Sequence, residues 1–493
     1  MSQTVAIVGA GIGGLAAAAR LARAGRRVVV FEQADQTGGK AASVRLGGYR
    51  FDVGPSLLTL PGVFRDFFAR LGRDVRDYLE PIPLDPICAY EFADGTRLCS
   101  RPDRARFAAE LERAGVATRA ELEAYLNRAA RLWRDAGELF LTRSLHDPGT
   151  YFSRAGLRAI LRAPGLSPFQ SLHAAHARAF ADPRAVQLFD RYATYNGSSP
   201  FHTPATMRVI PHVECAFGGH ALRGGIVALP RALERVAREC GAEFRLGARV
   251  DRIVVANDRC RGVEANGAFC AADAVVSNAD VLATYRRLLN QPAAPEARRQ
   301  ARQEPSSSGL VFLWGMARRF PQLQVHNVFF SGDYRREFAA IFEELDLPAE
   351  PTIYVNVTSK VEAADAPPDG ENWFVLLNAP RDAGQDWPAV AARARAAVRT
   401  RLGRALGCDL AAWIREERVI TPADIERDTG STHGSLYGMA SHSAISAFLR
   451  HPNRSRRIRG LYFAGGSAHP GGGMPLALLS GTLAAELLER HEP

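Results

Sequence analysis

The same pattern occurs near both ends of the chain: an apolar run, then glycines, then a helical pattern. The apolar run 5–8 predicts a strand covered on both faces, because no polar residue alternates with its side chains. Glycines follow, and an alanine-rich helical pattern over 15–24 leads to a second apolar run over 28–31. Residues 460–488 show the same succession of apolar run, glycine-rich turn and helical pattern. Two strand–turn–helix units at opposite ends predict a long cofactor held from both sides.

The middle of the chain alternates helical and strand-like patterns without an internal repeat. Helical periodicity covers 64–71 and 104–132, and the run 87–98 resembles a hairpin that turns at Asp94-Gly95. Several strand-like runs between 309 and 377 predict a sheet that forms one wall of a substrate chamber. The other expected elements are strands over 243–255 and 272–280 and helices over 231–240 and 387–406.

The first turn has the chemistry of a dinucleotide site. Gly9, Gly11 and Gly14 match the spacing G-x-G-x-x-G between a strand and a helix. Gly9 permits the tight turn, Gly11 lets the backbone approach a pyrophosphate, and Gly14 allows close packing of helix on strand. Glu32 ends the second strand, where a carboxylate accepts hydrogen bonds from ribose hydroxyls. The complete unit predicts dinucleotide binding, which a glycine motif alone would not.

Size and charge bear on the class of protein. A chain of 493 residues predicts two or more domains. The formal net charge is +10, and Lys40 and Lys360 are the only lysines beside the many arginines. The arginines are scattered and no nucleic-acid motif surrounds them, so nucleic-acid binding is not expected.

Cysteine usage and the long apolar segments bear on the compartment. The seven cysteines form no C-x-x-C pair and their number is odd, which favours a reducing compartment. The first residues lack the basic start and long apolar core of a secretory signal. Residues 460–485 carry no charged side chain, but their glycines and prolines would break a helix in lipid. We therefore expect a cytoplasmic protein without a spanning segment.

Motifs beyond the first turn carry a resemblance to a known family. Thr37-Gly-Gly-Lys40 follows the acidic strand end, and Gly54-Pro55 lies a little further on. The C-terminal turn contains Ala464-Gly-Gly-Ser467 and His469-Pro-Gly-Gly-Gly-Met-Pro475. The chain resembles the glutathione-reductase-like FAD proteins of the amine-oxidase and carotenoid-desaturase branch. Within that branch it looks most like the bacterial-type phytoene desaturases and the hydroxycarotenoid desaturases.

The resemblance implies a fold and a set of FAD contacts. The fold is α/β, with a glutathione-reductase-like FAD-binding Rossmann domain (1–75, 226–290 and 431–493) and an inserted α+β substrate domain (76–225 and 291–430). FAD is expected to be noncovalent, because no cysteine lies near the C-terminal turn. Ser467 stands where many FAD proteins have an acid, which leaves the ribityl or phosphate contact open. The implied contacts are Gly9, Gly11, Gly14, Glu32, Gly38, Gly39 and Lys40 toward the phosphates and ribose, Gly54 and Pro55 beside the isoalloxazine, Val250 at the adenine, and Gly465, Gly466 and Met474 in the second turn.

The candidate catalytic residues are less sharply marked. Removing two hydrogens from a polyene needs a hydride acceptor and the loss of a neighbouring proton, with little general acid–base power. The sequence has no Ser-His-Asp order, no H-E-x-x-H and no metal-ligand cluster, so no metal is expected. The candidates for a proton acceptor or polar anchor are Asp147, His212, Glu214 and His469. Each has a structural alternative: His469 could cap its turn, and His212 and Glu214 could pair with arginines.

One segment has the pattern of a membrane-surface helix. Arg154, Arg158 and Arg162 recur at spacing four, and apolar residues occupy the neighbouring arc. The alternative is an exposed helix that packs on its own domain, with the arginines as its solvated face. We expect a peripheral association with the inner membrane. The apolar residues concerned are Tyr151, Phe152, Leu157, Ile160, Leu161 and Phe169.

The resemblance implies an FAD-dependent desaturase of an acyclic carotenoid, of the phytoene or neurosporene type or with a hydroxyl or methoxy end. Two alternatives within enzymes are a carotenoid cis–trans isomerase and an oxidase that installs a terminal aldehyde. An alternative from another class is a noncatalytic isoprenoid escort on the same fold. The intact Gly9, Gly11 and Glu32 disfavour the escort, which has no need of a redox-ready flavin. The sequence does not predict the oligomeric state.

Overall fold

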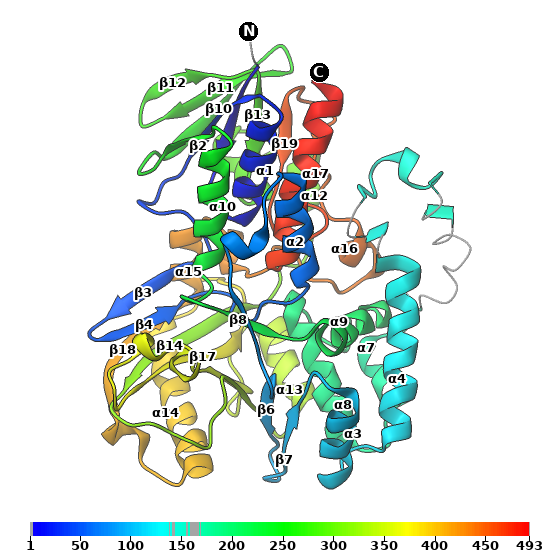
Figure 1. The fold of residues 1–493 in the computed structure, drawn as a ribbon, viewed down its shortest axis with the longest axis vertical. Helices are drawn as coiled ribbons and strands as arrows, with labels where there is room; N and C mark the ends of the chain where they lie inside the picture. The colour runs from blue at the N-terminus through cyan, green and yellow to red at the C-terminus, as the bar shows by residue number, and fades with distance from the viewer. Residues whose placement is uncertain are drawn as a thin grey trace.

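The computed structural model describes residues 3–137, 139–140, 143–153, 156–157, 167 and 169–492. They form two parts stacked along the long axis of the molecule (Figure 1). The parallel-sheet part carries both termini, and the mixed-sheet part lies at the other end. The chain passes between them more than once, so each part is assembled from segments that are far apart in sequence.

The parallel-sheet part is built on five strands in the order β19-β13-β1-β2-β9. All neighbouring strands are parallel. Alternate side chains of β1 and β2 enter two different apolar cores, which explains why their apolar runs contain no polar positions. The strands are β1 (Thr4–Val8), β2 (Arg27–Phe31), β9 (Glu243–Arg245), β13 (Ala274–Ser277) and β19 (Leu461–Phe463).

Helices cover one face of this sheet and a smaller sheet covers the other. On the first face α1 (Ile12–Arg23) packs against α10 (Ala228–Glu239) and α17 (Met474–His491) (Figure 1). A Cβ added to Gly481 of α17 would lie 2.0 Å from the carbonyl oxygen of Gly13, so the backbones of α1 and α17 are in contact. The smaller sheet consists of the antiparallel strands β10 (Val250–Ala256), β11 (Arg259–Ala265) and β12 (Ala268–Ala271).

The mixed-sheet part contains seven strands in the order β18-β14-β17-β16-β15-β6-β7. Only β15 and β6 pair in parallel among the described strands of this sheet. This strand order confirms the sheet expected between 309 and 377. One face of the sheet packs on α14 (Trp387–Leu406). The strands are β6 (Cys88–Glu91), β7 (Arg97–Ser100), β14 (Ser308–Met316), β15 (His326–Phe329), β16 (Ile353–Asn356), β17 (Glu371–Ala379) and β18 (Ile414–Ile420).

The opposite face of the mixed sheet is covered by two kinds of element. The hairpin β3 (Ser43–Leu46) and β4 (Tyr49–Asp52) packs on β14 and β17, and a group of helices packs beside β6 and β15. β5 (Pro81–Pro83) and β8 (His220–Leu222) pair where the chain passes between the two parts. The helices not yet named are α2 (Pro61–Arg70), α3 (Arg104–Arg113), α4 (Arg119–Leu132), α7 (Leu172–Ala177), α8 (Pro183–Asp190), α9 (Val209–Phe217), α11 (Val281–Ala283), α12 (Pro295–Ala301), α13 (Tyr334–Ala339), α15 (Pro422–Thr429) and α16 (Ala444–Phe448).

Two expected elements are divided in the structure. The helical pattern over 104–132 forms α3 and α4, because Gly115 has a left-handed φ of +62° and Thr118 begins a new helix with a capping box. The strand pattern over 243–255 forms β9 and β10 in two different sheets. Gly247 (φ +66°) turns the chain between these two strands.

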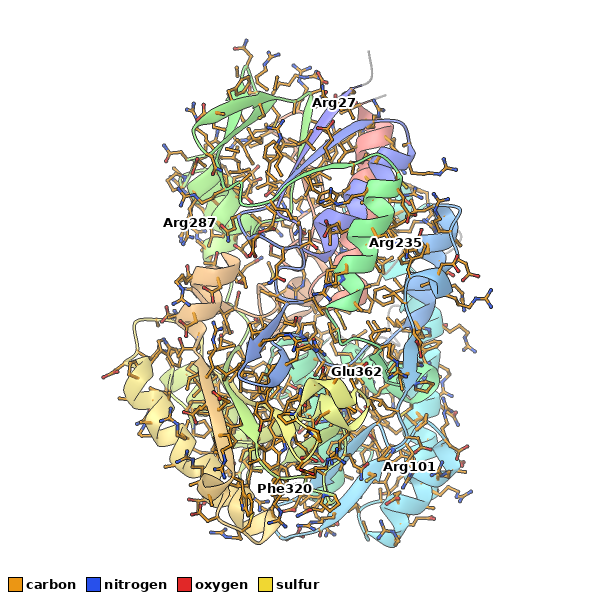
Figure 2. The ribbon with its side chains drawn as sticks, turned by 60° about the vertical axis from the view of Figure 1, so that its left-hand side comes forward. Arg27, Arg101, Arg235, Arg287, Phe320 and Glu362 are labelled. Atoms are coloured by element: carbon orange, nitrogen blue, oxygen red, sulfur yellow. The ribbon has the colours of Figure 1, made fainter. Side chains whose placement is uncertain are left out.

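Many of the exposed arginines are paired with carboxylates. Arg27, Arg235 and Arg287, labelled on the parallel-sheet part in Figure 2, are exposed. They form ion pairs with Glu243, Glu239 and Glu426 at 3.8, 3.0 and 3.1 Å.

In the described part of the chain, no helix is both long enough and apolar enough to cross a membrane.

Candidate functional site

The first glycine turn lies at the carboxyl end of the central strand β1. Gly9 has φ +93°, and a Cβ added to Gly14 would lie 2.1 Å from the Gly9 carbonyl oxygen. Helix α1 then begins after Gly11, with no side chain capping its first amides. These amides, together with the helix dipole, are the donors that a phosphate needs. The turn and the first amides of α1 thus lie where the motif predicts a phosphate, and the phosphate contact itself stays a prediction.

Glu32 and the segment before Val250 lie beside this turn. The Glu32 carboxylate is buried and accepts hydrogen bonds from the amides of Ala10 at 2.7 Å and Ala34 at 2.9 Å. The Glu32 carbonyl accepts a hydrogen bond from the amide of Ala248 at 2.8 Å. Val250 follows two residues later as the first residue of β10. The two residues expected at the ribose and the adenine are therefore brought to one end of the site, and their contacts to FAD stay predictions.

The second glycine pair lies directly on the first turn. The amide of Gly38 donates to the carbonyl of Ala10 at 2.9 Å, and a Cβ added to Gly39 would lie 3.5 Å from Cα of Gly11. A Cβ on Gly54 would lie 1.7 Å from the Lys40 carbonyl oxygen, so Gly54 and its neighbour Pro55 run against the same segment. The expected pyrophosphate and isoalloxazine contacts thus come from adjacent stretches of backbone.

The side chain of Lys40 is held by the segment 431–436. Its ammonium donates to the Ser431 hydroxyl at 2.7 Å and to the carbonyls of Ser435 and Leu436, both at 2.9 Å. Removal from water lowers the pKa of Lys40 to about 8, and the nearby charge of Asp280 opposes that shift. These three acceptors take all three ammonium protons. The side chain of Lys40 therefore binds the 431–436 segment, while the backbone of Lys40 lies beside the glycine turns. A phosphate contact of Lys40 stays a prediction.

The C-terminal turn meets the N-terminal turn across one asparagine. Gly465 (φ +95°) follows β19, and a Cβ added to Gly13 would lie 2.7 Å from the amide nitrogen of Gly465. Asn278 follows β13, and Cβ atoms added to Gly13 and Gly465 would lie 2.6 and 2.7 Å from its Oδ1. Gly466 and the helix-initiating Met474 belong to this same turn. The sequence predicted a strand over 272–280 but carried no signal that the side chain of Asn278 contacts both turns.

A buried arginine holds the second turn in place. Arg450 is 3% exposed and donates to the carbonyls of Tyr437 at 2.7 Å, Met439 at 3.1 Å and Gly466 at 3.4 Å. Burial lowers the pKa of Arg450 to about 10. No carboxylate of the described residues forms an ion pair with it, so backbone carbonyls satisfy its charge. Sequence reasoning missed Arg450 because it is one arginine among many.

Two of the candidate proton acceptors, His469 and Asp147, lie near the C-terminal turn. His469 is fully buried, and its Nε2 lies 2.9 Å from the carbonyl oxygen of Arg143. Burial lowers the pKa of His469 to about 4, which makes it a neutral side chain. Asp147 pairs with Arg490 of α17 at 2.7 Å and is partly exposed. Neither arrangement distinguishes catalysis from a structural role.

His212 and Glu214 lie apart from these residues, on α9 of the mixed-sheet part. Glu214 is 1% exposed and accepts hydrogen bonds from the hydroxyls of Tyr192 at 2.7 Å and Tyr195 at 2.6 Å. The nearest Arg191 nitrogen is 3.7 Å from Glu214. His212 packs against aromatic rings, and burial lowers its pKa. The four candidates thus divide into two groups, and their catalytic roles stay predictions.

The two glycine turns, the acidic strand end and the parallel sheet fit a long dinucleotide. Gly11 and Gly39 lie close together, since a Cβ added to Gly39 would lie 3.5 Å from Cα of Gly11, and glycine at both positions leaves the backbone open to a pyrophosphate. Bound FAD supplies the oxidant that accepts a hydride from the substrate. The fold and the site define an FAD-dependent oxidoreductase.

Comparisons with known proteins give the same class and narrow it. Residues 12–488 match the model of the family described as flavin containing amine oxidoreductase. The chain is 42% identical to a 1-hydroxycarotenoid 3,4-desaturase of Flavobacterium sp., covering 98% of each chain. It is 34% identical to a 4,4'-diapolycopene oxygenase of Methylomonas sp., covering 98% of this chain and 97% of the relative. A solved oxidoreductase of Methanosarcina mazei shares the fold, with a TM-score of 0.66 at 17% identity and coverage of 98% and 100%. The chain belongs to the flavin-containing amine oxidoreductase family, in its carotenoid desaturase branch.

Proposed function

We propose that the chain desaturates an acyclic carotenoid that carries a tertiary hydroxyl or methoxy group at one end. The observation that carries this proposal is the 42% identity, over 98% of both chains, to a relative named for a 1-hydroxycarotenoid. Desaturation removes one hydride and one proton from neighbouring carbons and leaves a double bond. The hydride goes to FAD, and the proton goes to a basic group or to solvent.

The packing beside Gly54 supports an apolar substrate. Tyr49 and Phe51 of β4 lead toward this glycine and pack on Val311, Leu313 and Phe374 of the mixed sheet. These side chains form a buried apolar cluster close to the backbone expected along the isoalloxazine. A polyene gains its binding energy from burial of its own apolar surface, at about 25 cal/mol per Å².

Co-expression in hosts that accumulate defined carotenoids tests the substrate. We expect a shift of the pigment absorption to longer wavelength in a host that accumulates 1-hydroxyneurosporene, because each new double bond extends the conjugation. Hosts that accumulate phytoene or neurosporene serve as the comparison, and we expect a much smaller shift of their spectra. A shift in the phytoene host alone would contradict the proposed end group.

An oxygenase is the second candidate, because the relative from Methylomonas sp. is named as one. Mass spectrometry of the product separates the two. A desaturase product lacks two hydrogens of the substrate, whereas an oxygenase product contains an added oxygen. We expect the first result.

We further infer that the chain docks on a membrane surface through the side chains of Phe152, Leu157 and Phe169. Phe152 is 80% exposed, Phe169 98% and Leu157 50%. Exposed aromatic and leucine side chains in a segment rich in arginine are typical of membrane-surface segments. Arg154, Arg158, Arg162, Ile160 and Leu161 of the expected basic helix lie outside the described residues.

Paired serine substitutions at Phe152 and Phe169 test the membrane contact. We expect partitioning into phosphatidylethanolamine–phosphatidylglycerol vesicles to fall by about tenfold or more, because each buried phenylalanine contributes about 1.5–3 kcal/mol. Phe269→Ser is the matched control, since Phe269 is 54% exposed but lies on β12 of the parallel-sheet part. Equal vesicle binding by the paired variant and the control would refute the inference.

A further inference from the structure

The polar side chains of His326, Tyr354 and Asn356 lie together on the face of the mixed sheet that is opposite α14. His326 of β15 pairs with Asn356 of β16, and Tyr354 lies two residues before Asn356. The intervening Val355 belongs to the core on α14, so alternation along the strand places Tyr354 and Asn356 on the opposite face. His326 is 3% exposed and Asn356 2% exposed. A buried polar group on this face needs hydrogen-bond partners.

The hydrogen bonds determine which nitrogen of His326 carries the proton. Nδ2 of Asn356 lies 3.0 Å from the carbonyl oxygen of Val325, which can only accept, so the amide orientation is fixed. The same Nδ2 lies 3.2 Å from Nδ1 of His326, and the hydroxyl of Tyr354 lies 2.7 Å from it. Nδ1 is therefore an acceptor. Burial and the charge of Arg191 lower the pKa of His326 to about 3, so the ring is neutral and its proton is on Nε2.

The Nε2–H donor of His326 is buried without a partner among the described residues. A buried donor left unsatisfied costs about 1–3 kcal/mol. The other side of the ring is held firmly, because Tyr354 stacks on it with centroids 6.0 Å apart as well as donating to it. The Nε2–H donor of His326 is thus held in a fixed direction, and none of the described residues provides an acceptor for it.

This donor is linked to the segment expected beside the flavin. The hydroxyl of Ser56 lies 2.5 Å from that of Tyr354. Since Tyr354 donates to His326, Ser56 donates to Tyr354. Ser56 directly follows Gly54-Pro55, so one chain of hydrogen bonds runs from the expected isoalloxazine segment to His326. If this chain oxidises the 3,4 bond of a 1-substituted carotenoid, as the name of the 42% identical relative states for that protein, three bonds of about 1.5 Å separate the oxygen from the nearer carbon of that bond. The oxygen of such a substrate must therefore bind close to the flavin.

We propose that Nε2–H of His326 donates a hydrogen bond to the oxygen of the hydroxyl or methoxy end group and thereby selects the substituted carotenoid. The inference rests on the proposed function and adds the residue that reads the end group. A donor accounts for both substituents, because an alcohol and an ether each present an acceptor oxygen, whereas an ether cannot donate. Tyr354 is a positioning residue, which acts through His326.

Steady-state kinetics with three substrates tests this proposal on the FAD-loaded enzyme. The substrates are a 1-hydroxycarotenoid, its methyl ether and the unsubstituted carotenoid of equal conjugation. For His326→Phe we expect kcat/KM to fall about tenfold for both oxygenated substrates, as for loss of one hydrogen bond. The value for the unsubstituted carotenoid is expected to stay within about twofold. For Tyr354→Phe we expect a smaller loss in the same direction, because Asn356 still donates to Nδ1.

Controls separate recognition from packing. Val328→Ala removes buried volume on the same strand and, by the alternation of the strand, on the same face, and is expected to leave the ratio between the substrates unchanged. Flavin content and thermal melting show whether each variant is folded. An equal loss for all three substrates in His326→Phe would overturn the proposal in favour of a packing role. A loss for the alcohol but not for the ether would overturn the donor assignment.

The outcomes for the wild-type enzyme separate this inference from the proposed function. Failure to desaturate any of the three substrates would refute the proposed function itself. Desaturation of the oxygenated substrates with an unaltered preference in His326→Phe would leave the proposed function intact and refute only the role of His326.

Discussion

Replacing Gly11 with alanine is expected to yield a folded protein that no longer retains FAD. The added Cβ would lie 2.7 Å from Nδ2 of Asn278, and that side-chain atom can shift. No backbone atom outside the immediate neighbours is within 4 Å of it, so the fold should tolerate the methyl group. The methyl group would, however, occupy the approach of the pyrophosphate. We expect FAD affinity to fall by about 100-fold or more, or about 2.7 kcal/mol.

Gly14 in α1 and Gly25, which follows α1, provide the comparison. In Gly14→Ala the new Cβ would lie 2.1 Å from the Gly9 carbonyl oxygen, so the turn itself must open and both stability and FAD should be lost. In Gly25→Ala nothing lies within 4 Å of the Cβ, and only the strain at φ +85° remains, at about 1–2 kcal/mol. This variant should stay yellow. Absorbance of heat-released flavin and circular-dichroism melting measure both effects. Wild-type FAD affinity in Gly11→Ala would contradict the assigned cradle.

Arg450→Met is expected to loosen the second turn and to release FAD. The carbonyls of Tyr437, Met439 and Gly466 would lose the donor that satisfies them. Each buried carbonyl left without a donor costs about 1–3 kcal/mol, so we expect the free energy of unfolding to fall by about 3 kcal/mol or more. Thermal melting and flavin content check the result.

Arg450→Lys separates the charge of this residue from its hydrogen-bond geometry. An ammonium keeps the charge but cannot reproduce the planar fork that spans the three carbonyls. We therefore expect an intermediate melting temperature and partial flavin content. The assigned role would be wrong if the methionine variant matched the wild type in both measurements.

Much of the geometry of the N-terminal glycine turn was predictable, because the sequence signals for it are local. Gly9, Gly11 and Gly14 lie within one turn, and their conformations follow from short-range steric demands. The hairpin at Asp94-Gly95 was predictable for the same reason and forms β6 and β7. The division of 104–132 into two helices was missed. Helical periodicity continues across Gly115, whose left-handed φ ends α3.

The contacts that complete the site join residues that are remote in the chain. Asn278 contacts both Gly13 and Gly465, Arg450 binds carbonyls on two segments, and Ser56 reaches Tyr354 across 298 positions. No periodicity or motif marks such partners, because each is an ordinary residue until the strands are ordered in the sheets.

The sequence by itself determined the dinucleotide turns, the strand and helix patterns and, through its resemblance to a family, the cofactor and the class of reaction. Those properties depend on residues that interact within a few positions of one another. Only the tertiary structure decided that Lys40 directs its charge to 431–436, that the four candidate proton acceptors divide into two groups, and that His326 holds a buried, unpartnered donor. These features depend on which strands and segments become neighbours, and burial then sets their hydrogen bonds and protonation.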